Sequence, residues 1–133
     1  MTHKLLSVLT FGIAILLASC SRDGVTGDWI TSESSSSQAS NLSIDSDGTV
    51  ESWYDGNDGS FSIEGTWKYT DESKKTIIVQ FDPSTIEADL DNPIAQAIVI
   101  RGLEIIAAET QTMTLSDDGK RLNVSGGKSY IRN

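Results

Sequence analysis

The chain has 133 residues, of which 10 are Lys or Arg and 19 are Asp or Glu, so its formal net charge at pH 7 is −9. This charge disfavours nucleic acid as a partner, because contacts with phosphates need a basic face that an acidic chain does not offer. The length supports one domain built around a single hydrophobic core.

Residues 1–19 are typical of a secretory signal peptide. Lys4 gives a basic start, and an apolar run extends from residue 5 to residue 18. This run is shorter than the roughly 20 apolar residues of a transmembrane helix and fits the core of a signal peptide. We therefore expect residues 1–19 to be removed. The mature chain would begin at Cys20 with a charge of −10, since nine Lys and Arg remain against 19 acids.

The residues before Cys20 resemble the lipobox of bacterial lipoproteins. Leu17 and two small residues, Ala18 and Ser19, precede the cysteine. The resemblance implies that Cys20 receives diacylglycerol and a further acyl chain such as palmitate. These chains would anchor the protein in the cell envelope, and Ser21 is compatible with the outer membrane. Residues 20–24 would then form a lipidated tether for a domain over residues 25–133. The alternative is an uncleaved membrane anchor in which Cys20 is a buried thiol.

Loss of the signal peptide also limits the chemistry of the mature chain. The single histidine, His3, lies in the signal peptide, and the single cysteine is Cys20. Ser-His-Asp and Cys-His nucleophiles, and the usual zinc sites, need an imidazole or a free thiol. Paired carboxylates could hydrolyse glycosides, but among 19 acids some pairs lie close together by chance. We therefore expect no enzyme, no cofactor and no metal.

Four strands are predicted in the first half of the domain. Their β-branched, aromatic and alternating apolar residues lie at 25–31, 42–44, 49–54 and 60–70. The fourth is the clearest, because its odd-numbered residues from Phe61 to Tyr69 share one face over about ten residues. Asp and Gly in the connecting turns tolerate the positive φ that hairpins need. A serine-rich polar loop over residues 32–40 separates the first two strands.

The second half continues this pattern with one interruption. Further strands are predicted at 76–81, 112–116, 121–125 and 129–132. Between them, Asp82 and Pro83 fit the cap and first position of a short helix or a flap over residues 82–93. Residues 94–108 fit either period, and their β-branched residues favour a strand with Gly102 at a bulge. We expect an all-β antiparallel meander of about eight strands, closed into a small barrel that has no free edges.

Several short motifs, taken in order, resemble those of lipocalins and of the small lipocalin-like domains of envelope lipoproteins. The first, Gly27-Asp28-Trp29, is similar to the G-x-W of the first lipocalin strand, and matching segments follow at 47–49, 65–67, 113–115 and 130–132. The resemblance implies a lipocalin-like barrel and a small apolar ligand as a candidate partner. It also implies that an arginine of the closing strand packs over Trp29; Arg132 matches best, and Arg121 is the alternative.

The residues leave several uses of this domain open. One set of side chains could bind an apolar ligand or simply fill a barrel of this size, namely Trp29, Trp53, Phe61, Ile63, Trp67, Tyr69 and Phe81. A filled barrel would be a structural or protein-interaction module of the envelope, with Ile86 and Leu90 exposed on the flap. The acidic turn residues could bind calcium, but no EF-hand spacing is present and turn chemistry explains them: Asp45, Asp47, Asp55, Asp58, Asp117 and Asp118.

Substitution of Cys20 tests the lipid anchor. Cys20→Ala should abolish incorporation of an acyl probe and leave residues 1–19 attached, because no thiol remains for the lipid. Labelling is measured in cells that produce the variant, wild type or the neighbouring control Ser21→Ala. Equal labelling of Cys20→Ala and wild type would contradict the assignment.

Overall fold

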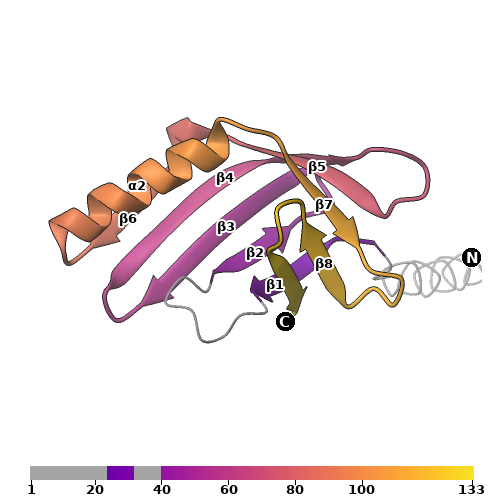
Figure 1. The fold of residues 1–133 in the computed structure, drawn as a ribbon, viewed down its shortest axis with the longest axis horizontal. Coiled ribbons are helices and arrows are strands. Elements are labelled where there is room, and N and C mark those ends of the chain that lie inside the picture. The colour runs from indigo at the N-terminus through magenta and orange to yellow at the C-terminus, as the bar shows by residue number, and fades with distance from the viewer. Residues whose placement is uncertain (1–23, 32–39) are drawn as a thin grey trace, which may run out of the picture.

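The computed structural model describes residues 24–31 and 40–133. They form a closed barrel of eight antiparallel strands, with a further short strand and one α-helix beside it (Figure 1). The elements are β1 (Gly27–Thr31), β2 (Asn41–Ile44), β3 (Thr49–Gly56), β4 (Gly59–Tyr69), β5 (Thr76–Phe81), the 3-10 turn η1 (Pro83–Thr85), β6 (Glu87–Leu90), α2 (Pro93–Ala107), β7 (Gln111–Leu115), β8 (Arg121–Val124) and β9 (Ser129–Arg132). The predicted signal peptide, Cys20 and nearly all of the predicted loop at 32–40 lie outside the described residues.

Pairing of the last strand with the first closes the barrel. Strands β1 to β5 pair in chain order, β5 pairs with β7, and β7, β8 and β9 follow one another. β9 then pairs antiparallel with β1, setting Arg132 opposite Trp29 and Tyr130 opposite Thr31. A closed ring has no unpaired edge that could recruit another chain. The predicted antiparallel meander and its closure are confirmed.

Acidic residues and glycines shape the turns between the strands. In the β2–β3 turn Gly48 has a φ of +96°, and the Asp47 carboxylate accepts a hydrogen bond from Thr49 N at 3.0 Å. In the β7–β8 turn the Asp118 carboxylate accepts one from Lys120 N, also at 3.0 Å. Hydrogen bonds to the ionised carboxylates lower the pKa of both carboxyl groups. The largest effect comes from the Thr49 side chain at Asp47 and from the Ser116 side chain at Asp118. These acids therefore stabilise the turns, as predicted for them.

β4 is the longest strand and pairs with β3 along one edge and with both β5 and β6 along the other. Its residues from Gly65 to Tyr69 pair with β5, whereas its first residues, from Gly59 to Ser62, pair with β6. Between these two segments, Glu64 O accepts from Asp82 N at 2.8 Å, and Glu64 N donates to Thr85 Oγ1 at 2.8 Å. The turn η1 thus covers the gap in the ladder. It directs the chain out of the barrel into β6 and α2.

The prediction for residues 82–93 is right about the cap and wrong about the segment after it. Asp82 accepts a hydrogen bond from Ser84 N and Pro83 takes the first helical position, but the helix is a single 3-10 turn. Ile86 and Leu90, expected to be exposed on a flap, are half-buried, and Ile86 packs against the core. Both are covered because β6 extends the sheet from β4 and α2 lies against it (Figure 1).

Residues 94–108, predicted as a strand with a bulge at Gly102, are instead the helix α2. The Asn92 side chain caps it by accepting from Ile94 N at 2.8 Å and Ala95 N at 3.2 Å, and Pro93 follows at the first position. This cap outweighs the strand preference of β-branched residues, which is weak and depends on context. No helix among the described residues has the length and apolarity to cross a membrane.

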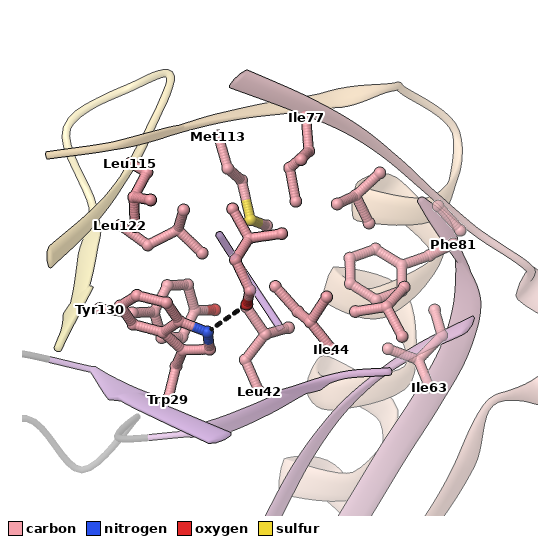
Figure 2. Packing of buried hydrophobic residues seen from close by; sticks show 14 of the residues in the cluster. Trp29, Leu42, Ile44, Ile63, Ile77, Phe81, Met113, Leu115, Leu122 and Tyr130 are labelled. Carbon is pink, nitrogen blue, oxygen red and sulfur yellow. Dashed lines mark hydrogen bonds between the residues drawn. The ribbon is translucent and has the colours of Figure 1, made fainter. Parts of the chain in front are cut away.

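The barrel interior holds the hydrophobic core (Figure 2). Every strand of the closed ring contributes an inward side chain, and α2 adds Leu103 and Ala107 at one side. The core is made of Val25, Trp29, Leu42, Ile44, Val50, Ile63, Ile77, Val79, Phe81, Leu103, Ala107, Met113, Leu115, Leu122 and Tyr130. The period-two pattern predicted for β4 is confirmed, because Ile63 is buried while Glu64, Thr66 and Lys68 are exposed.

Two substitutions near the closure test this core. Leu122→Ala in β8 should lower the free energy of unfolding by about 2–5 kcal/mol, because Leu122 is fully buried only when the barrel is closed. Ile131→Ala in β9 should cost less than about 1 kcal/mol, because Ile131 is 37% exposed on the outer face. Denaturant unfolding measures both. Similar losses for the two variants would show that the barrel is not closed at β8 and β9.

Candidate functional site

The structure gathers six of the seven predicted ligand-site residues and separates the seventh. Trp29, Ile63 and Phe81 lie in the core, and the half-buried Phe61, Trp67 and Tyr69 pack against it. Trp53 pairs with Ser62 across β3 and β4, so it lies on the opposite face of the sheet from Phe61 and Ile63. Its side chain is 36% exposed. The seven residues therefore do not form one pocket.

Side chains from opposite walls of the barrel meet in its interior. Trp29 and Leu42 point toward Met113 and Leu122 from across the barrel (Figure 2). The Trp29 ring is fully buried, and its Nε1 donates to Val25 O at 2.9 Å. Close packing of this kind leaves the interior occupied by the protein's own residues.

A small polar cluster lies inside the barrel, where the Tyr130 phenol of β9 contacts Ser52 of β3 and Ser40, which precedes β2. Burial raises the pKa of the Tyr130 phenol, and hydrogen bonds with Ser40 and Ser52 partly offset that effect. Ser40 N also donates to Thr31 Oγ1 at 3.3 Å. Within the described part of the chain, every buried side-chain nitrogen and oxygen has a hydrogen-bond partner. The cluster is thus satisfied by the chain itself.

Arg132 connects the closing strand β9 to the residues just before β1. Its guanidinium carbon lies 4.3 Å from the centre of the Trp29 ring, a cation–π contact. The same group donates from Nε to Gly119 O at 3.0 Å, from Nη1 to Thr26 O at 2.9 Å, and from Nη2 to Gly24 O. This is the contact that the lipocalin resemblance implied for Arg132. Arg121, the alternative, instead donates to Ser129 Oγ at 3.1 Å.

The outer face of β3, β4 and β6 forms a shallow groove of about 510 Å³ next to Trp53. Glu51 and Asp55 flank Trp53 along β3, and the small side chains of Ser60 and Ser62 in β4 lie between β3 and β6. On β6, Glu87 pairs with Ser62 and Asp89 with Ser60. An exposed aromatic ring thus lies among carboxylates that project from two strands.

Carboxylates on this outer face repel one another. Glu51 lies directly opposite Glu64, and like charges at such a position destabilise a sheet. Burial raises the pKa of the Glu51 carboxyl group, and repulsion from Glu64, Asp45 and Glu87 raises it further. In the described ranges 24–31 and 40–133, no group of three or more His, Cys, Asp or Glu side chains has a geometry that could hold a metal ion. The face is acidic without forming a recognisable metal site.

The outward face of α2 carries the most exposed large apolar side chains of the described residues. Ile94, Ile98 and Ile105 are 72%, 66% and 58% exposed and follow one another along the helix. We call these three residues the isoleucine stripe. Leu103 and Ala107 occupy the opposite, buried face. Exposed apolar side chains that gather on one helix face are candidates for contact with another molecule.

Hydrogen bonds fix α2 to the sheet at both ends. The side chain of Gln96 accepts from Leu90 N of β6 at 2.8 Å, and the side chain of Gln80 in β5 donates to Ala107 O at 2.9 Å. The stripe therefore belongs to a held element rather than to a loop. It was not predicted from the sequence, because the segment was expected to be a strand. The Asn92-Pro93 cap, followed by isoleucines at helical spacing, would have revealed it.

The raised pKa of Glu51 gives a stability prediction with a defined sign. Ionised Glu51 destabilises the fold at neutral pH, and this penalty is absent below the unfolded-state pKa of about 4.3. Glu51→Gln should therefore raise the melting temperature by a few degrees at most at pH 7, and by nothing at about pH 3.5. Asp55→Asn, opposite Ser60 rather than another acid, is the control and should gain less. A lower melting temperature of Glu51→Gln at pH 7, or an equal increase at both pH values, would contradict the repulsion at Glu51.

Comparison with known proteins finds no relative of this chain. No protein-family model, curated protein or solved structure matches the chain. The function is therefore inferred from the hydrophobic core of the barrel, the acidic outer face with Trp53, and the isoleucine stripe.

Proposed function

We propose that this chain is a lipid-anchored lipoprotein of the cell envelope whose barrel is a rigid support for a protein-interaction surface. The lipobox at residues 17–20 supports the anchor on Cys20, most simply in the outer membrane. The G-x-W at residues 27–29, with Arg132 packed over Trp29, supports a lipocalin-like barrel. The isoleucine stripe on α2 is the proposed contact with an envelope partner.

The observation that carries this proposal is where the apolar side chains lie. A carrier of apolar ligands keeps an apolar cavity inside and a polar surface outside. Here the interior is filled by its own core residues, such as Trp29 and Leu42, and apolar side chains are instead exposed on α2. This distribution favours a filled, structural barrel that binds partners from outside.

Binding of a small apolar ligand is the second candidate, and one feature favours it. Trp67 and Tyr69 pack edge to face with ring centres 5.0 Å apart, and both are only half-buried. Trp67 Nε1 donates to Asp45 O at 2.7 Å, and Tyr69 Oη accepts from Val25 N at 3.3 Å. These two partly exposed rings are the aromatic surface that an apolar ligand would contact.

Tryptophan fluorescence separates the two candidates. In the variant Trp53→Phe/Trp67→Phe, Trp29 is the only remaining tryptophan, and it lies in the core. We expect blue-shifted emission that fatty acids, sterols and other apolar compounds do not change, because core side chains occupy the interior of the proposed filled barrel. The matched variant Trp29→Phe/Trp53→Phe reports on Trp67 in the same way. A saturable change in either variant would favour the ligand carrier and argue against the filled barrel.

A further inference from the structure

The described residues fix the point at which the chain enters the barrel. Gly24 O accepts a hydrogen bond from the Arg132 guanidinium, and Val25 N donates to Tyr69 Oη at 3.3 Å. Arg132 and Tyr69 are the last residues of β9 and β4. The chain therefore enters at the end of the barrel where these two strands finish. We call this end, together with its β4–β5 and β7–β8 turns, the entry end.

The β3–β4 turn, β6 and the start of α2 lie at the opposite end of the molecule (Figure 1). β4 runs from there to the entry end, and its length from Gly59 to Tyr69 corresponds to roughly 33 Å of extended strand. β6 pairs with the first residues of β4, and α2 packs on β6. We call the β3–β4 turn, β6 and α2 together the arm.

A lipid on Cys20 would hold the entry end close to the bilayer. This step rests on the proposed function, which places the anchor on that residue. Four peptide units separate Cys20 from Gly24, and they span at most about 14 Å when fully extended. Because β4 is more than twice as long, the tether by itself allows the domain to stand on its entry end or to lie along the membrane.

The distribution of charge decides between these two orientations. Residues 51–67 and 76–100, which contain the β3–β4 turn, β6 and the first half of α2, include eight Asp and Glu but no Lys or Arg. At the entry end both turns carry lysines beside their acids, and Lys75 forms an ion pair with Asp117 at 2.9 Å. Anionic headgroups attract basic segments and repel acidic ones. The arm is therefore the part of the domain that such a bilayer repels most.

α2 does not have the composition of a helix that lies on a membrane. Such helices carry many Lys and Arg on their polar face. Arg101 is the single basic residue of α2, and Asp89 and Asp91 come shortly before the helix begins. The isoleucine stripe is thus better suited to an apolar protein surface than to acyl chains.

We propose that the entry end of the barrel rests on the headgroups of the anchoring bilayer and that the arm points away from it. The β4–β5 and β7–β8 turns then contact lipid. The isoleucine stripe and the carboxylates around Trp53 face the aqueous side. The partner of the stripe is therefore a protein and not the bilayer.

Quenching by a lipid with a nitroxide on its headgroup tests this orientation. The full lipidated chain is inserted into vesicles of phosphatidylethanolamine and phosphatidylglycerol that contain this lipid. A thiol-reactive fluorophore is attached at Glu72→Cys in the β4–β5 turn, at Asn57→Cys in the β3–β4 turn, or at Ile98→Cys in the stripe, three exposed positions. The chain without an added cysteine reports any labelling of Cys20. We expect several-fold stronger quenching in Glu72→Cys than in the other two variants.

The other outcomes separate the orientation from the anchor. Equal quenching in Glu72→Cys and Ile98→Cys would overturn the proposal, because the domain would then lie along the membrane, while the anchor would stand. Stronger quenching in Asn57→Cys, or none in any variant bound to vesicles, would overturn it as well. Failure of the wild-type chain to float with the vesicles would contradict the anchor itself, and the orientation with it.

Charge reversal tests whether repulsion holds the arm away from lipid. Asp55 and Asp89 both lie opposite Ser60 on the exposed outer face of the sheet. In the Asn57→Cys background, Asp55→Lys/Asp89→Lys should raise quenching several-fold in the anionic vesicles and leave it unchanged in phosphatidylcholine vesicles with the same nitroxide lipid. Unchanged quenching in the anionic vesicles, or an equal rise in both, would overturn the role of charge in the orientation.

Discussion

The guanidinium group of Arg132 makes the contact on which the closed barrel depends. It covers the Trp29 ring and donates to carbonyl groups of Gly24, Thr26 and Gly119, which belong to the domain entry and the β7–β8 turn. Charge-assisted hydrogen bonds of a planar guanidinium are stronger than neutral ones and fix geometry. One side chain thereby ties the first strand, the last strand and a turn together. Closure in turn buries Leu122 and Tyr130, which an open sheet would expose.

The function that we propose for this closed barrel lies on its outside. Its interior is filled by inward side chains of every strand, so little distinguishes it chemically from any other hydrophobic core. The features that need another explanation lie on the surface. They are the isoleucine stripe of α2 and the repelling carboxylates around Trp53. β6 pairs with the start of β4, adds Glu87 and Asp89 to the acidic face, and gives α2 a surface to pack on.

Much of the fold could be predicted from alternation and turn chemistry, as β4 and the Asp-Gly turns show. The position of Arg132 over Trp29 followed from the lipocalin resemblance. Periodicity alone left the α2 segment open, because its apolar runs, such as Ile98 to Ile100, fit either period, and the Asn92-Pro93 cap was the signal that sequence reasoning missed. Trp53 was grouped with the core by its aromatic character alone. Glu51 and Asp55, two residues to either side on the same face, indicate that this face of β3 points to solvent.

Hydrogen exchange of the full chain in its native membrane, compared with the chain in detergent, tests most directly whether partners bind outside a filled barrel. Backbone amides that a bound partner stabilises exchange more slowly. We expect slower exchange along α2 in the membrane, with the strands of the closed ring unchanged. Slower exchange in β4, β5 and β7, with α2 unchanged, would place an occupant inside the barrel and contradict binding from outside.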